Sequence, residues 1–215
     1  MRRLAIALAE CTAALLVVMV AVSLITGATQ EVHEHYALPD AYAASLLEHP
    51  GALRLVFALD IAFIAFYTGF FAAFARYLGG RGRAFARLAL GFMIATAALD
   101  VLEDHHIVTM LDAAEQHVLP TSSAIAFQVV LSSTKFSVSY LSLFLFGLAI
   151  PRDTRLGFVL CMFLTAGTLI SAVVGYALPP SAMASFDSGR WVGFLIGFGL
   201  AIAWLVKSPD VAEKG

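Results

Sequence analysis

The stretch LVFALDIAFIAFYTGFFAAFA, residues 55–75, decides the class of fold, because it runs for 21 residues with one charged side chain, Asp60. About 20 consecutive apolar residues are enough for an α-helix to cross the hydrocarbon core of a bilayer. The whole chain has the same character: 60% of its 215 residues are hydrophobic, 13% are charged, and its mean hydropathy is +0.88. A soluble domain carries roughly 25% charged residues, so this composition predicts an all-α, polytopic membrane protein.

Six apolar runs meet this length criterion, and we expect each to form one membrane-spanning helix of a single six-helix domain. The runs cover residues 4–26, 52–75, 86–108, 123–150, 156–178 and 190–207. The first run follows a basic start, as in a signal peptide, but it is longer than the apolar core of a usual signal peptide. We therefore expect it to be retained as the first span.

The positive charges divide unevenly between the two ends of the predicted spans. Ten of the thirteen Lys and Arg side chains lie at the end that carries both termini: Arg2, Arg3, Arg76, Arg81, Arg83, Arg87, Arg152, Arg155, Lys207 and Lys214. Arg54 and Arg190 lie at the opposite end. The positive-inside rule therefore predicts cytoplasmic termini and residence in the inner membrane of the cell. The net charge of −2 gives no indication of nucleic-acid binding.

The longest connection on the predicted outer side covers residues 28–51 and could fold over the mouth of the bundle as a lid. All six histidines lie on this side or at its boundary: His33, His35, His49, His105, His106 and His117. Two interpretations stay open. Polar extracytoplasmic loops are commonly rich in His, or some of these residues converge as metal ligands or proton carriers.

The third predicted span contains the unusual stretch ALDVLEDHH, residues 98–106. Its carboxylates Asp100, Glu103 and Asp104 are spaced i, i+3 and i+4, so they share one helix face, with His106 flanking that face and His105 pointing elsewhere. Three ionised carboxylates so close together would repel one another, so either one keeps a proton or a cation sits among them. Asp60 enters the membrane from the same side and could join the group.

The fourth predicted span carries one polar stripe. Gln128, Ser132, Lys135, Ser139 and Ser142 recur at intervals of four, three, four and three residues. These intervals place them on one face of a helix. A charged side chain inside a membrane usually faces the protein interior and pairs there, so we expect Lys135 to meet a carboxylate.

These residues together predict a polar site in the outer half of the bundle. The candidates for acid–base catalysis are Asp100, Glu103 and Lys135. The candidate ligands of a divalent metal are Asp60, Asp100, Glu103, Asp104 and His106. The candidates for substrate binding are Gln128, Ser132, Ser139, His33 and His35.

A simpler interpretation also fits the third span. If that helix ends near Leu102, the EDHH residues are an interfacial cap, and Asp100 is the one buried acid, forming a structural pair with Lys135. The continuing sequence IVTML before Asp112 instead favours a helix that runs on past the cluster.

Three classes of function fit the predicted site, so whether the chain is an enzyme stays open. The favoured class is an enzyme that uses a divalent metal or acid–base groups on a lipid or other membrane-soluble substrate, although no HExxH or GxSxG motif is present. A proton- or cation-coupled carrier is the second class. A structural or sensor subunit with a buried Asp–Lys pair is the third.

The motif Asp100-x-x-Glu103-Asp104, followed by a lone Lys135 in the next span, resembles a group of short bacterial membrane proteins. In that group an Asp-x-x-Glu-Asn motif precedes a Lys-bearing helix, so this chain departs from the motif at Asp104. The group has no assigned activity, and the resemblance implies a fold and topology but no reaction.

Small residues recur every four positions in several predicted spans, as in Gly193, Gly197 and Ala201. This spacing lets helix backbones approach closely. It could serve packing inside the bundle or a homodimer interface, and the sequence does not separate the two.

Overall fold

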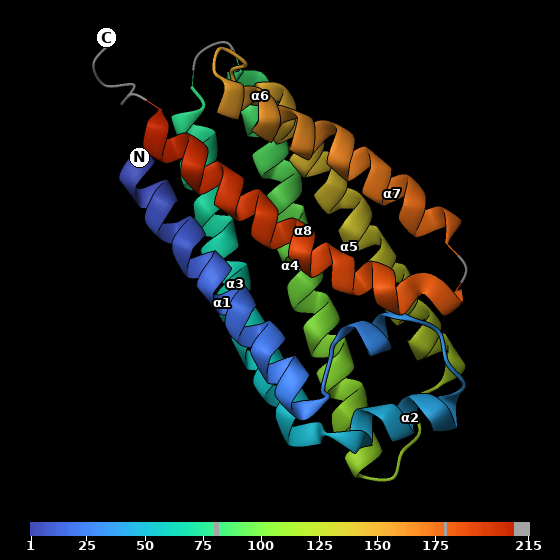
Figure 1. Cartoon of the computed structure of the whole chain (residues 1–215). Coiled ribbons are helices and arrows are strands. Elements are labelled where there is room, and N and C mark those ends of the chain that lie inside the picture. The colour runs from blue at the N-terminus through green and yellow to red at the C-terminus, as the bar shows by residue number, and fades with distance from the viewer. Residues whose placement is uncertain (80–81, 179, 209–215) are drawn as a thin grey trace.

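The computed structural model describes residues 1–79, 82–178 and 180–208, and every regular element within them is a helix (Figure 1). Among these residues, six helices are long and apolar enough to cross a membrane. The predictions of an all-α class and of six spans are therefore confirmed. Two of the charges used to predict the orientation, Arg81 and Lys214, lie outside the described residues.

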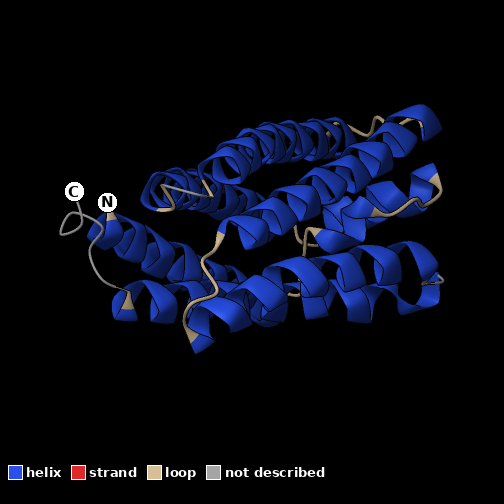
Figure 2. Cartoon of the chain, turned by 90° about the horizontal axis from the view of Figure 1, so that it is seen from above, coloured by secondary structure: helices blue, strands red, loops and turns tan. Residues whose placement is uncertain are grey.

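The six spans run alongside one another as a bundle (Figure 2). They are α1 (Arg2–Thr26), α3 (Pro50–Tyr77), α4 (Arg83–Glu115), α5 (Ser122–Ala149), a composite span (Arg155–Ala177) and the Gly189–Lys207 part of α8 (Pro180–Lys207). The composite span consists of α6 (Arg155–Met162), a π-helical turn η2 (Phe163–Gly167) and α7 (Thr168–Ala177). The connection between α1 and α3 contains the 3₁₀-helix η1 (Glu31–Glu34) and the short helix α2 (Pro39–Glu48).

The start of α1 and the end of α8 lie at one end of the bundle, and α2 lies at the other (Figure 1). The Arg2 guanidinium donates a hydrogen bond to the backbone oxygen of Ser208. This contact joins the start of α1 to the end of α8. We call the end away from the termini the distal end, and residues 28–49 the lid. The cytoplasmic location of the termini stays a prediction.

Several helix ends coincide with local sequence signals. Gly27 ends α1 with a φ of 75°. Glycine adopts this left-handed conformation without steric strain because it has no Cβ atom. Pro39 and Pro50 occupy the first turns of α2 and α3, where the missing N–H costs no helical hydrogen bond. The Thr121 hydroxyl accepts a hydrogen bond from the Ala124 N–H and so caps α5.

The helix α4 does not end at Leu102 but continues to Glu115. Its residues beyond the acidic cluster, Ile107 and Leu111, are fully buried and pack in an apolar cluster with Leu46 of the lid. Glu103 and Asp104 are consequently 0% and 2% exposed. The interpretation of the EDHH residues as an interfacial cap is wrong, because this apolar cluster lies between them and the distal end.

The half of the bundle near the termini is packed with aromatic rings. Phe71 stacks on Phe146 of α5 with 5.0 Å between ring centroids, and Phe74 meets Trp204 of α8 at 5.9 Å. Such contacts contribute beyond the area that they bury. They join α3, α5 and α8 into one apolar core.

Small residues allow close helix contacts at defined places. A Cβ on Gly69 of α3 would lie 3.4 Å from the Leu8 side chain, so α1 packs closely against α3 here. The Ser142 hydroxyl of α5 donates a 2.7 Å hydrogen bond to the Ala89 carbonyl of α4. These contacts serve packing within one chain, and a homodimer stays a prediction.

Gly147 provides a test of this packing. A Cβ at this position would lie 2.7 Å from Thr165 Cγ2 and 3.1 Å from Leu164 Cβ, so Gly147→Leu must push α5 away from η2. Overpacking of this kind costs about 1–3 kcal/mol. We expect a lower midpoint of thermal unfolding for the purified variant. The matched control is Gly91→Leu, where a Cβ meets nothing within 4 Å; equal midpoints for both variants would contradict the helix arrangement.

Candidate functional site

The polar stripe of α5 faces the interior of the bundle. Gln128, Ser132, Lys135, Ser139 and Ser142 are all buried. Val130 on the other side of the same helix is 62% exposed. The interior face of α5 therefore places one ammonium group, that of Lys135, among the neighbouring helices of the bundle.

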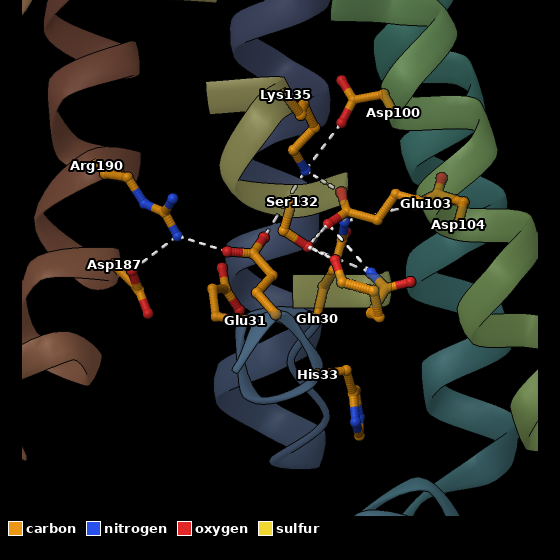
Figure 3. A network of polar contacts seen from close by, with 12 residues as sticks. Gln30, Glu31, His33, Asp100, Glu103, Asp104, Ser132, Lys135, Asp187 and Arg190 are labelled. Carbon is orange, nitrogen blue, oxygen red and sulfur yellow. Dashed lines mark hydrogen bonds and ion pairs between the residues drawn. The ribbon is translucent and has the colours of Figure 1, made fainter. Parts of the chain in front are cut away.

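Lys135 pairs with three carboxylates from two different elements (Figure 3). Its Nζ lies 3.0 Å from Asp100 Oδ1, forms an ion pair with Glu103, and lies 3.8 Å from Glu34 Oε1. Asp100 and Glu103 belong to α4, whereas Glu34 belongs to the lid. Asp100 also accepts a 2.8 Å hydrogen bond from the Tyr67 hydroxyl of α3. The expected contact between Lys135 and the carboxylates of span three is present.

Glu103 is the most completely enclosed member of this network. It accepts hydrogen bonds from the Ser132 hydroxyl and, at 3.3 Å, from the Gln128 amide. His106 contacts Gln128 at 2.7 Å, so it reaches Glu103 only through that side chain. His105 is exposed, as its position on the helix indicates.

Asp60 of α3 completes the predicted group from the opposite wall. It is 5% exposed, and the carboxyl of Asp104 is a close neighbour. Asp104 itself accepts a 3.4 Å hydrogen bond from Gln30 of the lid on one oxygen. Its second oxygen is buried and has no hydrogen-bond partner among the described residues.

The lid supplies site residues that the sequence did not reveal. Gln30 donates to both Glu103 and Asp104 at 3.4 Å. Glu34 bridges Lys135 to Arg190 of α8, with 2.8 Å between Glu34 Oε2 and the Arg190 guanidinium. Each of these side chains is distant in sequence from its partner, so the helical spacing of polar residues within one segment does not predict these contacts. The one available hint was the pair of acids in EVHEH, residues 31–35.

Further lid contacts are made with α8. The indole N–H of Trp191 donates to Glu31, and His35 Nε2 lies 2.9 Å from Asp187 Oδ2. Asp187 in turn pairs with Arg190 at 2.7 Å. Burial raises the pKa of Glu31, and the Asp187 carboxylate raises the pKa of His35. Both shifts come from the closed position of the lid.

His33 has a structural place within the lid. Its ring is 3% exposed, packs edge-on against Tyr42, and points away from the charged network (Figure 3). Burial lowers its pKa to about 4. Neither His33 nor His35 lines the cavity described next, and of the predicted substrate-binding residues Ser139 does.

A cavity of about 520 Å³ extends from this network into the bundle. Its polar end is formed by Glu31, Glu34, Asp60, Asp100, Lys135 and Arg190. The remaining wall is mainly apolar and aromatic, with Phe70 and Phe74 from α3 and Phe194 from α8. Gly193 and Gly197, two of the small residues of α8, line this space rather than an outer face.

The predicted metal ligands do not form one coordination group. Across the described ranges, no three His, Cys, Asp or Glu side chains are arranged to hold a metal ion. The position between Asp100 and Glu103 is taken by the ammonium of Lys135. The cation that the three spaced carboxylates require is therefore supplied in part by the chain itself, and a divalent metal stays a prediction.

The network contains more acids than bases. In the described part of the chain its carboxylic acids are Glu31, Glu34, Asp60, Asp100, Glu103, Asp104 and Asp187. Lys135 and Arg190 are its permanently cationic members. Unpaired ionised carboxylates are costly away from water, so protons or a bound cation must balance the excess.

Comparison with known family models, with curated proteins and with solved structures finds no match for this chain. The functional argument therefore depends on the geometry of the site.

Removal of the central cation should be strongly destabilising. The Lys135→Met variant leaves Asp100 and Glu103 buried without their partner, and breaking a buried pair in this way costs about 3–5 kcal/mol. We expect a large loss of stability in reversible denaturation of the purified protein. Lys207→Met, at an exposed position at the end of α8, is the control. A Lys135→Met variant as stable as this control would show that the network is not formed.

The contact between His35 and Asp187 predicts that the lid loosens as the pH rises. A raised pKa means that the stabilisation is complete below the ordinary His value of about 6.5 and is lost as the pH rises through the folded-state value. We expect faster hydrogen exchange of the η1 amides, corrected for intrinsic rates, at about pH 9 than at about pH 6.

The His35→Gln variant should lose most of this pH dependence. The raised pKa of Glu31 acts in the same direction, because a carboxyl whose folded-state pKa is raised also loses stabilisation as the pH rises. The charged groups that act on His35 are Asp187, Glu34 and Arg190. Unchanged pH dependence in His35→Gln would contradict the assignment to His35.

Proposed function

We propose that this chain binds an amphipathic, membrane-soluble molecule in the 520 Å³ cavity and acts on its polar head with acid–base groups. The observation that carries the proposal is the division of one cavity into a long aromatic wall and a buried charged end. Amphipathic molecules of the membrane have the same division. We place the charged end on the outer side of the inner membrane, following the distribution of Lys and Arg.

The size and lining of the cavity support a small-molecule ligand. Ligand sites commonly measure roughly 300–1,000 Å³ and combine an apolar wall with a few convergent polar groups. Here the polar groups are held by one another rather than by solvent, as in the pairing of Lys135 with Asp100. Such a site is organised before the ligand arrives, which lowers the cost of binding.

The cavity also borders a local irregularity of the helix. The π-helical turn η2 contributes Phe163, Leu164 and Gly167 to the wall, facing α8. Single π-helical turns inside α-helices are frequent at functional sites. This side of the bundle, between the composite span and α8, is where we expect a molecule from the membrane to enter.

The chemistry available at the polar end is proton transfer. Asp100 and Lys135 both line the cavity, and Tyr67 lines it beside them while donating to Asp100. Asp100 is positioned to exchange a proton with a bound head group, and the Lys135 ammonium can stabilise negative charge that develops there. Glu103 does not line the cavity, so we assign it the role of holding Lys135 in place.

The carrier alternative has less support. A proton or ion that crosses the bundle needs a polar route through both halves. Toward the termini the cavity ends against packed rings, where Phe74 of its wall meets Trp204 with 5.9 Å between ring centroids. Glu10, a carboxylate of α1 in that half, is exposed.

A substitution that fills the cavity tests the proposal. Gly193 lines the cavity, and a Cβ there meets nothing within 4 Å, so the side chain of Gly193→Phe can start into the cavity and fill part of it. The probe is a long-chain alcohol that carries a photoactivatable diazirine, added to the full chain in phosphatidylcholine nanodiscs. We expect peptides of the cavity wall to be labelled in the wild type and to fall to background in Gly193→Phe.

The matched control is Gly199→Phe on the same helix. Gly199 also has open space around a Cβ, but it is exposed and does not line the cavity. Labelling of the wall should persist in this variant. Wall labelling that is unchanged in Gly193→Phe, or labelling restricted to lipid-facing surfaces in the wild type, would refute the proposal.

A further inference from the structure

The helix α3 presents a regular stripe to the cavity. Asp60, Phe63, Tyr67, Phe70 and Phe74 follow one another at intervals of three, four, three and four residues, and all five line the cavity. These intervals keep them on one helix face. The stripe therefore begins with a carboxylate at the distal end and continues with four aromatic rings.

Asp60 takes no part in the ion pairs that the described residues form in the network. It is 95% buried, and among the described residues no Lys, Arg or His side chain forms an ion pair with it. A close neighbour of Asp60 is a second carboxyl, that of Asp104, one oxygen of which is buried and has no hydrogen-bond partner among the described residues. Asp60 and Asp104 are thus carboxylates of the network that form no ion pair with a described Lys or Arg side chain.

The two cations of the network are already engaged elsewhere. Lys135 is paired with Asp100, Glu103 and Glu34. Arg190 is paired with Glu34 and Asp187 and lies 3.7 Å above the Phe136 ring. Neither side chain forms an ion pair with Asp60, so a direct partner for its carboxylate would be a proton or a ligand.

Aromatic neighbours favour a cationic ligand over an anionic one. The rings of Phe63 and Tyr67 lie edge to face with 5.3 Å between their centroids, on the same stripe as Asp60. Ring faces attract ammonium groups, and aromatic side chains with a carboxylate are the usual means of recognising amines. A metal ion is disfavoured, since the described residues offer no third ligand beside the two acids.

We propose that the ligand of this cavity is a lipophilic amine whose ammonium group binds Asp60. The ammonium lies against Asp60 and the rings of Phe63 and Tyr67, and the hydrocarbon chain follows Phe70 and Phe74 into the bundle. This assignment rests on the proposed function and narrows it to one class of head group. It disfavours fatty acids and lipid phosphates as ligands, because their anionic heads would meet Asp60 at a polar end that has more carboxylates than cations.

A matched series of probes tests the assignment. The primary amine, the alcohol and the carboxylate of one chain length, each with the same diazirine, are titrated against the full chain in phosphatidylcholine nanodiscs. Labelling of the cavity wall is measured after subtraction of the signal in Gly193→Phe, which removes the contribution of probe in the bilayer. We expect half-saturation at an amine concentration at least about tenfold below that of the alcohol, as for a charge-assisted buried contact, and weaker binding of the carboxylate.

The Asp60→Asn variant should remove the preference while leaving the cavity in place. The alcohol should still label the wall in this variant, which shows that it is folded, and the amine should lose its advantage. Asp40→Asn, at an exposed position in the first turn of α2, should keep it.

The outcomes separate the two proposals. Equal binding of amine and alcohol in the wild type, or an amine preference that survives Asp60→Asn, would overturn the amine assignment and leave the cavity proposal standing. Failure of every probe to label the wall would overturn the proposed function itself. The wild-type comparison needs no variant, so it decides the question even if Asp60→Asn does not fold.

Discussion

The arrangement of the distal half depends on one charge, the ammonium of Lys135 near the middle of α5. An unpaired ammonium inside a membrane protein is costly, and its cost is reduced only by partners that also satisfy their own hydrogen bonds. Two of its carboxylates come from α4 and a third comes from the lid. The lid is therefore fixed to the bundle by the same interaction that joins α4 to α5, and Glu34 extends that link to Arg190 of α8.

The same network defines the cavity. Its polar end is made of side chains that hold one another in place, while the aromatic core of α3, α5 and α8 closes the end toward the termini. Because the site has more carboxylic acids than Lys and Arg side chains among the described residues, these side chains alone do not balance its negative charge. Asp60 lies at the boundary between the charged end and the aromatic wall. A ligand whose polar head contacts Asp60 can therefore also place its apolar part against the aromatic wall.

Sequence patterns could predict the spans and the relation of α4 to α5, because helix periodicity fixes both. The intervals among Asp100, Glu103 and Asp104, and those around Lys135, are local properties of single helices. The contributions of Gln30, Glu34 and Arg190 could not be predicted in this way, since they depend on how an irregular connection folds back over the bundle. The excess of acids over Lys and Arg near the distal end was visible, but the sequence did not show which carboxylates form ion pairs with Lys135 and which, like Asp60, do not.

The most direct test of this account is the reactivity of Lys135 in the folded chain. An amine-reactive reagent is applied to the protein in a bilayer, and modification is measured at each lysine by peptide mass spectrometry, with the exposed Lys207 as the internal reference. A buried ammonium held by three carboxylates should remain unmodified when Lys207 has reacted fully. Modification of Lys135 at the rate of Lys207 in folded protein would contradict the network on which the cavity and the lid depend.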